Sequence, residues 1–334
     1  MRICLEQAIA RLKHGEVVAI PTETVYGLAA DATNDSALKK IFEIKQRPAD
    51  HPLIVHIGDI SQVENWAACF PETARRLAAC YWPGPLTIVL PAKESVSRVV
   101  RGGESTVALR VPDHPVALAL LQQSALSLAA PSANLFTQLS PTTVEHVEKG
   151  LGDAIPVLDG GACQVGIEST IVSVTASGQW QVLRPGVIGE TQIAKMLNQP
   201  DLSQNPFSQL PKVPEILATD LKSTPRVPGQ HALHYSPLTP LLLFKQRDAL
   251  IQCSQALSAA HLTYATLMIG EGLQPQGLVI RLPNQPDKVA EQLYDTLHRL
   301  DALKLDRLLV ALPPSQAQWS AVSDRLSRAG QVQD

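Results

Sequence analysis

Eight prolines between residues 199 and 240 constrain the fold of this chain more than any other feature. They are Pro200, Pro206, Pro211, Pro214, Pro225, Pro228, Pro237 and Pro240, and the stretch around them has little hydrophobic periodicity. Proline fixes one backbone angle and lacks an amide donor, so the stretch favours a stiff, extended linker. Because 334 residues also suit two domains better than one, we predict a first domain at 1–198, a linker at 199–240 and a second domain at 241–334.

Charge and hydropathy narrow the environment in which the chain works. The formal net charge is −3, with 28 Lys and Arg against 31 Asp and Glu. This balance gives no overall attraction to nucleic acid or anionic membranes, although a local basic cleft would still allow weak RNA binding. Charge at Arg2 comes too early for a signal peptide, and no stretch approaches the roughly 20 apolar residues that span a bilayer. We therefore expect a cytoplasmic protein with no membrane partner.

Short apolar runs dominate the first 198 residues and predict a sheet. The expected strands are 17–20, 53–57, 86–90, 106–111, 128–130, 155–158, 169–174 and 180–184. Helical patterns lie at 3–12, 36–45, 61–68, 72–80, 115–123 and 190–197, and one more helix is expected just after Pro141. Because helices do not separate the strands regularly, the pattern predicts a twisted mixed sheet with helices packed on it.

The region after the linker has a different pattern. Apolar runs at 241–244, 264–269, 278–282 and 308–312 predict strands, and helical patterns such as 289–303 lie between several of them. This predicts a smaller, three-layer, Rossmann-like α/β domain. It contains no cluster of polar residues, so we expect it to support or regulate the first domain, for example by gating the linker.

The loop after the first strand is the first candidate for a ligand site. Thr22, Glu23, Thr24 and Tyr26 follow Pro21 there. Hydroxyls and a carboxylate at the end of an α/β strand are typical of a ligand crevice. A polar turn whose threonines bond their own backbone explains the segment equally well.

Basic residues follow along the chain. Lys45 and Arg47 lie at the end of a helix, where the helix dipole alone accounts for them. The buried strand that comes next carries His56, a residue that in such a strand is more often a hydrogen-bonded core histidine than a catalyst. Arg110 lies within another apolar strand, so it either reaches an exposed face, holds an anion or forms an internal ion pair.

Small and hydroxyl-bearing residues complete the set of candidates. Ser132 and Asn134 follow the short strand at 128–130, where small neighbours let a ligand approach the backbone, or where they simply form a turn. Ser140 and Pro141 suit the first positions of a helix, Thr142 and Glu145 could instead form a capping box, and that helix end could bind a phosphate.

Taken together, the candidates suit a phosphate-rich ligand and a small carboxylate. The cations are Lys45, Arg47, Arg110 and Arg184, and the hydroxyls are Thr24, Ser132, Ser140 and Thr170. The sequence has no G-x-x-x-x-G-K-[ST], G-x-G-x-x-G or G-x-S-x-G motif. The five cysteines form no Cys-x-x-Cys pair, which disfavours zinc and a disulfide framework.

Seven segments in register resemble the threonylcarbamoyl-AMP synthase family, in its two-domain form with a YrdC-like catalytic domain. They are PTETVYGLAADA, KQRPADHPLIVHI, WPGPLTIVL, TVALRVPDHP, LAAPSANLFTQLSPTT, GIESTIVSV and VLRPG, within roughly residues 5–195. PGQHALHYSP also resembles the linker of that family. The resemblance implies that L-threonine, bicarbonate and ATP give L-threonylcarbamoyl-adenylate and pyrophosphate. This product serves the tRNA threonylcarbamoyl-transfer machinery, which modifies an adenosine beside the anticodon.

The resemblance also implies roles for single residues. The threonine contacts would be Thr24, His56, Arg110, Ala130 and Thr170. The ATP contacts would be Arg47, His51, Thr106, Ser132, Ser140, Arg184 and the linker residue Tyr235. Lys45 and Arg47 would act in catalysis, and Mg²⁺ would be held mainly by the ATP phosphates. Family members often have Asn at the position of His51, and Met-Lys and Ala at those of Gln230-His231 and Ser236.

Two other functions compete with this one. An RNA-binding module without catalysis is one alternative, which the mild acidity and the 4% of aromatic residues disfavour. A carbamoyl-transfer domain like that of hydrogenase maturation proteins is the other. Those proteins carry zinc-finger cysteines and an acylphosphatase-like segment, whereas the cysteines here are scattered.

Overall fold

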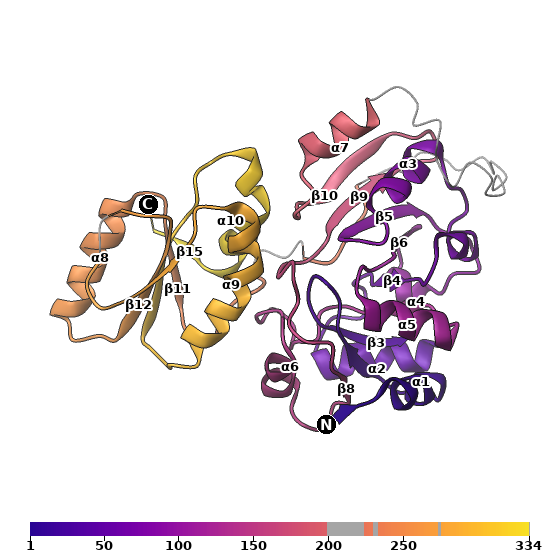
Figure 1. Cartoon of the computed structure of the whole chain (residues 1–334), viewed down its shortest axis with the longest axis horizontal. Helices are drawn as coiled ribbons and strands as arrows, with labels where there is room; N and C mark the ends of the chain where they lie inside the picture. Colours follow the sequence, from indigo (N-terminus) through magenta and orange to yellow (C-terminus); the bar gives the residue numbers. More distant parts are fainter. Residues whose placement is uncertain (199–223, 230–232, 273–274, 334) are drawn as a thin grey trace.

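A computed structural model describes residues 1–198, 224–229, 233–272 and 275–333. The chain forms two α/β parts that lie side by side, one around a ten-stranded sheet and one around a five-stranded sheet (Figure 1). This confirms the predicted fold class. The predicted linker residues 199–223 and 230–232 lie outside the described residues.

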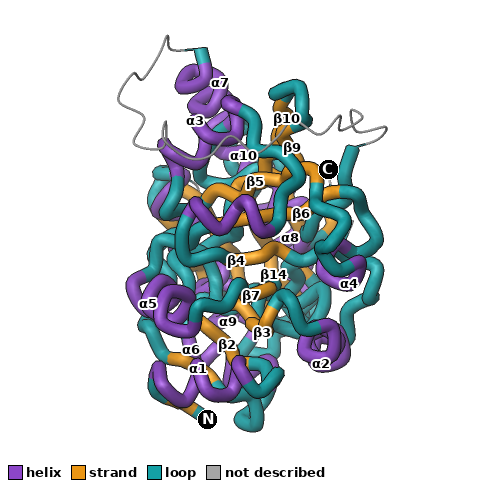
Figure 2. The backbone as a smooth tube through the Cα atoms, turned by 90° about the vertical axis from the view of Figure 1, so that its right-hand side faces the viewer, coloured by secondary structure: helices purple, strands orange, loops and turns teal. Residues whose placement is uncertain are grey.

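The first sheet is mixed, as its short connections predicted. Its strand order is β1-β8-β2-β3-β7-β4-β6-β5-β9-β10, and Figure 2 shows the sheet rising from β2 and β3 to β9 and β10. The strands are β1 Arg2–Ile3, β2 Val18–Ile20, β3 Gly27–Asp31, β4 Ile54–His56, β5 Leu86–Pro91, β6 Thr106–Arg110, β7 Leu128–Ala129, β8 Val157–Leu158, β9 Thr170–Val174 and β10 Trp180–Arg184. Strands β4 and β6 run parallel, and their register places His56 opposite Arg110.

Helices cover the two faces of this sheet unequally. The helices are α1 Leu5–Lys13, α2 Asp35–Lys45, α3 Glu72–Tyr81, α4 Arg98–Arg101, α5 Pro115–Ser124, α6 Val144–Leu151 and α7 Glu190–Leu197, and Ile60–Asn65 forms a 3-10 turn, η1. The large core places α2 and α3 against one face, while α1 and α5 pack on the other face near β2. On that second face, the middle strands bury Ile54, Ala108 and Ile171 against Val227 of the segment 224–229. We call residues 224–229 the strap.

One predicted helix start is wrong. Helix α6 begins at Val144, and its cap is Thr143, whose side chain accepts a hydrogen bond from the His146 amide. Ser140 therefore caps no helix, and the proposed box between Thr142 and Glu145 is not formed at this N-terminus. Ser140 is instead fully buried, and its Oγ donates to Glu168 Oε1 at 2.5 Å. The sequence pattern does not predict β3, because its glycine and small residues resemble a loop.

The second sheet is entirely parallel, with strand order β13-β12-β14-β11-β15. Its elements are β11 Leu241–Phe244, α8 Arg247–Ala259, β12 Tyr264–Ile269, β13 Leu278–Leu282, α9 Pro286–Asp301, β14 Arg307–Ala311, η2 Ala317–Trp319, α10 Ser320–Ala329 and β15 Gln331–Val332. Helices α9 and α10 lie on the side that faces the first domain, and α8 lies on the far side (Figure 1). One apolar cluster joins these two helices to Val25, Leu139 and Ile167 of the first domain.

Two absences concern the described part of the chain. None of its helices has the length and apolar character needed to cross a membrane. Nor do three or more His, Cys, Asp or Glu side chains gather there in a group that could hold a metal ion.

Candidate active site

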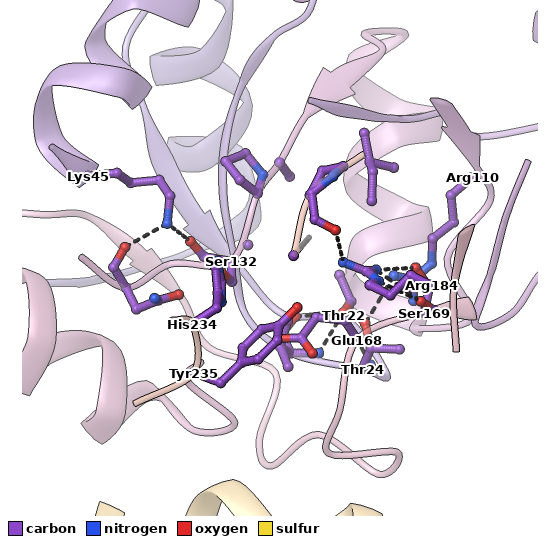
Figure 3. Close-up of a pocket in the computed structure, with 18 of the residues that line it drawn as sticks. Thr22, Thr24, Lys45, Arg110, Ser132, Glu168, Ser169, Arg184, His234 and Tyr235 are labelled. Carbon is purple, nitrogen blue, oxygen red and sulfur yellow. Dashed lines mark hydrogen bonds between the residues drawn. The ribbon is translucent and has the colours of Figure 1, made fainter. Parts of the chain in front are cut away.

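A buried pocket lies on the second face of the first sheet, where β4, β6 and β10 carry polar side chains and the segment just before β9 adds two more. Figure 3 shows side chains that line it. The loop after β2, the loop after β7 and the strap surround it. The lining residues are Thr22, Thr24, Val25, Gly27, Lys45, Arg47, Ile54, His56, Arg110, Ala130, Pro131, Ser132, Asn134, Phe136, Glu168, Ser169, Arg184, Pro228, Gly229, His234 and Tyr235.

Arg110 forms an internal ion pair, which resolves one of the open alternatives. Its Nη2 lies 2.6 Å from Glu23 Oε1, and both side chains are about 5% exposed. Its Nη1 donates to Thr24 Oγ1 at 3.0 Å, and its Nε donates to the carbonyl oxygen of Gly84 at 3.2 Å. The guanidinium therefore links the loop after β2 to the end of β6, and it still lines the pocket.

Lys45 turns into the protein instead of complementing the dipole of α2. Its Nζ donates to the carbonyl oxygens of Ser132 at 2.5 Å and Asn134 at 2.6 Å, as Figure 3 shows. Burial and the nearby Arg47 lower the pKa of this amine well below its usual value. Lys45 thus fixes the loop after β7 and supplies an amine that carries its charge less readily than an exposed lysine.

Arg47 and Arg184 bring two more guanidinium groups to the pocket. Arg47 Nη2 donates to Pro52 O at 3.0 Å, and its buried Nε has no hydrogen-bond partner among the described residues. Burial lowers the pKa of Arg47 to about 10. Arg184 Nε and Nη2 donate to Ser169 O, and its Nη1 donates to Pro228 O at 3.2 Å, so it joins β9 to the strap.

His56 is a buried neutral imidazole. Burial and the charge of Arg110 lower its pKa to about 3. Its Nδ1 finds no partner in the described part of the chain, although the ring lines the pocket. The residue is therefore available to a ligand as an uncharged hydrogen-bonding group at neutral pH.

The structure brings most of the predicted site residues together. Those that line the pocket are Thr24, Lys45, Arg47, His56, Arg110, Ala130, Ser132, Arg184 and Tyr235. His51 lines an adjoining cavity of about 220 Å³ that shares Arg47, Phe136 and His234 with the pocket.

Three residues with predicted substrate contacts line neither the pocket nor the adjoining cavity. Thr170 shares the face of β9 that carries Val172 and Val174, and its Oγ1 donates to Ile188 O at 2.9 Å. Thr106 is buried two residues before Ala108 on β6, away from the lining. The hydroxyl of Ser140 donates its hydrogen bond to Glu168. For Thr170, burial on both faces of β9 hides from the sequence which way the side chain points. Thr106 shares the face of Arg110 but lies four residues earlier on β6, and Ser140 lies outside the strands.

Sequence reasoning missed Glu168, Ser169 and His234 as lining residues. Glu168 is 7% exposed and accepts hydrogen bonds from Ser140, Tyr294 and Arg325. Its only signal in the sequence is its place in the GIESTIVSV segment, two residues before a buried strand. A lone carboxylate at such a position is usually a solvated turn residue, so local pattern could not identify it.

Tyr235 occupies the pocket between Lys45 and Arg184 (Figure 3). Its backbone adopts φ 61°, and its hydroxyl has no hydrogen-bond partner among the described residues. Gly229 of the strap comes so close that a Cβ there would lie 2.2 Å from this hydroxyl. The space left beside the ring is about 50 Å³, far less than the several hundred Å³ of a typical ligand pocket.

Known proteins match the whole chain. The family described as telomere recombination matches residues 10–186, and the C-terminal domain of threonylcarbamoyl-AMP synthase matches residues 188–330. The chain is 39% identical to the threonylcarbamoyl-AMP synthase of Bacillus subtilis, over 97% of this chain and 92% of the relative. It is 36% identical to that of Pyrococcus abyssi, over 95% and 91%. The crystal structure of P. abyssi Sua5 complexed with L-threonine matches with a TM-score of 0.84 and 32% identity, over 98% of this chain and 96% of that chain.

Proposed function

Because the chain belongs to the threonylcarbamoyl-AMP synthase family, we propose that its pocket converts L-threonine, bicarbonate and ATP into L-threonylcarbamoyl-adenylate and pyrophosphate. The observation that carries this proposal is the convergence of Lys45, Arg47, Arg110 and Arg184 on one buried pocket. A threonine carboxylate, a carbamate and a triphosphate are all anionic, so these cations would offset their mutual repulsion.

Threonine is proposed to bind at the side of the pocket formed by Thr24, His56, Arg110 and Ala130. Arg110 is held in place by Glu23 and Gly84, so its guanidinium can bind the threonine carboxylate with little further loss of side-chain conformational entropy. The neutral ring of His56 offers a hydrogen bond without adding charge. Thr170 would support this side only indirectly, through its bond to Ile188.

ATP is proposed to bind along Arg47, Ser132 and Arg184, with His51 at the adjoining cavity. The threonine amine would first attack the carbon of bicarbonate, so that a C–N bond forms while the C–OH bond breaks and the hydroxyl leaves as water with a proton from the amine. An oxygen of the resulting carbamate would then attack the α-phosphate. Pyrophosphate leaves as the new phosphorus–oxygen bond forms. Lys45, Arg47 and Arg184 would stabilise the charge that develops on the phosphate oxygens.

Mg²⁺ is proposed to bind through the phosphates of ATP and through water. Glu168 is the one carboxylate among the described residues that line the pocket, and it already accepts hydrogen bonds from three side chains. The protein thus offers Mg²⁺ few ligands of its own, which fits an ion that enters bound to the nucleotide.

We propose that Tyr235 leaves its place before ATP enters, because the space of about 50 Å³ beside its ring is smaller than a nucleotide needs. We propose that the strap and Tyr235 then close again over bound substrates. Closure would exclude water, which would otherwise hydrolyse the adenylate.

The test is an assay of pyrophosphate release with ATP, bicarbonate and labelled threonine, with the adenylate identified by mass spectrometry. We expect release that depends on threonine and on bicarbonate. Arg184→Met should lower kcat by about 100-fold or more, because it removes a donor to developing charge. Release that is independent of threonine would contradict the proposal.

The product is proposed to pass to the tRNA threonylcarbamoyl-transfer machinery in the cytoplasm. The alternative of an RNA-binding module without catalysis has no support from the relatives, which are named as synthases. Weak RNA binding beside catalysis is still a prediction. A gel shift of unmodified tRNA at low and moderate salt would test it, since phosphate contacts weaken steeply with salt.

A further inference from the structure

A side chain of the second domain reaches the wall of the pocket. Arg325 lies on α10 and is fully buried, and its Nε is 2.7 Å from Glu168 Oε2. Its Nη1 donates to Pro185 O at 3.0 Å and to Asp324 Oδ2 at 2.7 Å, and its Nη2 donates to Glu168 O at 3.3 Å. Asp324 also pairs with Arg328, so Glu168 is the carboxylate that depends on Arg325 of the second domain. The two residues are 157 positions apart in the sequence, so this contact exists only because the two domains pack together.

The contacts of Arg325 bracket two residues of the pocket. Glu168 precedes Ser169, and Pro185 follows Arg184. Ser169 is the residue to which Arg184 donates through Nε and Nη2. Arg325 therefore holds both chain segments that set the position of the Arg184 guanidinium.

Tyr294 of α9 adds a second bond from the same domain. Its hydroxyl donates to Glu168 Oε2 at 3.1 Å. Burial by itself would raise the pKa of Glu168, but the charges of Arg325 and Arg184 and the bond from Ser140 hold it at about 2. Glu168 is therefore an anion in a pocket proposed for anionic substrates, and its charge is balanced from the second domain.

We propose that the second domain completes the active site, with Arg325 as a positioning residue that neutralises and orients Glu168 so that the pocket accepts ATP. This inference rests on the proposed function. Without Arg325, a carboxylate left unpaired at the pocket wall would repel the triphosphate, and Ser169 and Arg184 would lose a common support. Tyr294 helps to orient Glu168 in the same way, through a hydrogen bond from its uncharged hydroxyl.

The first experiment separates binding from chemistry in the full-length protein. Arg325→Met should raise the KM for ATP by about 10-fold or more, while the KM for threonine changes much less. Tyr294→Phe, which keeps the ring and removes only the hydroxyl, should raise the KM for ATP by about 2- to 5-fold. The control is Arg299→Met on α9, whose side chain is 70% exposed and should leave both constants unchanged.

The second experiment asks whether Arg325 acts through the charge of Glu168. In R325M the pKa of Glu168 should rise, so the loss of kcat/KM for ATP should shrink as the pH falls from 8 to 6. In E168Q/R325M this extra pH dependence should vanish, and the KM for ATP should return close to that of E168Q. In this double variant Glu168 carries no charge and Asp324 keeps Arg328 as its partner at 3.0 Å, so the variant also serves if R325M does not fold.

The outcomes are distinguishable. A wild-type protein that shows no threonine-dependent pyrophosphate release overturns the proposed function. An active wild type in which R325M has a parallel pH profile and an unchanged KM for ATP overturns this inference alone. If the KM for ATP in E168Q/R325M rises by the product of the two single-variant factors, the inference is overturned as well, because the two residues would then act independently.

Discussion

At the scale of single residues, the pocket is built from charges whose partners lie far away in the sequence. Arg110 and Glu23 are 87 positions apart, yet each is almost fully buried and each has the other as its ion-pair partner. A buried pair contributes little net stability, because both groups lose hydration. Removing one partner is costly, since the other charge is then buried alone.

Arg110→Met tests this asymmetry. We expect it to lower the free energy of unfolding by about 3–5 kcal/mol, because the Glu23 carboxylate is left unpaired. Glu23→Gln combined with Arg110→Met should recover much of this stability without restoring threonine use. Urea denaturation followed by circular dichroism measures the effect.

Arg2 provides the matched control for that prediction. It pairs with Glu145 and Glu148, but its side chain is 48% exposed. Arg2→Met should therefore destabilise the protein much less than Arg110→Met does. If Arg2→Met and Arg110→Met lower the free energy of unfolding by similar amounts, burial of the ion pair does not decide how much stability is lost.

At the scale of elements, the C-terminal end of α2 delivers two of the four cations of the pocket. Asn34 caps the helix, accepting hydrogen bonds from the amides of Ser36 and Ala37. At the other end, Gln46 adopts a left-handed conformation with φ 52°, and the chain turns there between Lys45 and Arg47. The two cations can therefore approach the pocket from adjacent positions of one turn.

Asn34→Ala should destabilise the protein by about 1 kcal/mol, because two amides at the start of α2 lose their acceptor. Asn34→Asp keeps the acceptor and should be close to neutral. Since Lys45 is tied to the loop after β7, we expect kcat and the KM for ATP to stay unchanged in both variants. Thermal unfolding together with steady-state kinetics checks this, and a large loss of activity in Asn34→Ala would contradict it.

At the scale of the whole molecule, a pair of histidines lies between the domains. His298 of α9 stacks on His146 of α6 with the ring centroids 3.9 Å apart, and its Nε2 donates to Ser140 O at 3.1 Å. Burial lowers the pKa of each ring to about 4, and for His298 the nearness of His146 adds to this effect. Both rings are therefore neutral at neutral pH, and two neutral rings can stack without repulsion.

Acid should weaken the contact between the domains. The folded pKa values of about 4 lie below the usual 6.5, so the stabilising contribution is complete above pH 6.5 and is lost as the pH falls towards 4. At pH 5 the loss should be roughly 1–2 kcal/mol for each histidine. His298→Gln should therefore flatten the dependence of Tm on pH between 7 and 5.

An exposed histidine gives the control for this measurement. His14→Gln changes a side chain at the end of α1, outside the contact, and should leave the slope of Tm against pH as it is. His56 and His234 also have lowered pKa values in the pocket, so part of the slope should persist in His298→Gln. An unchanged slope in His298→Gln would rule out the stacked pair as a source of acid sensitivity.

The sequence by itself determined most of the elements and most of the site. Apolar runs located β11, β12 and β13 with their observed bounds, because a short apolar run of strand length is a local signal. Segments in a fixed order brought Thr24, Lys45, Arg47, Arg110 and Arg184 into one expected pocket. Apolar runs and ordered segments are properties of short stretches of chain, so they can be recognised from the sequence alone.

Only the tertiary structure decided which partner each buried polar group meets. Thr170 faces the core instead of the pocket, Ser140 bonds Glu168 instead of capping α6, and Arg325 of the second domain neutralises Glu168. Hydrophobic pattern reports that a residue is buried, but strands that are buried on both faces give no sign of direction. A buried charge requires a counter-charge, and where that charge comes from is settled only when segments distant in sequence, here two domains, pack together.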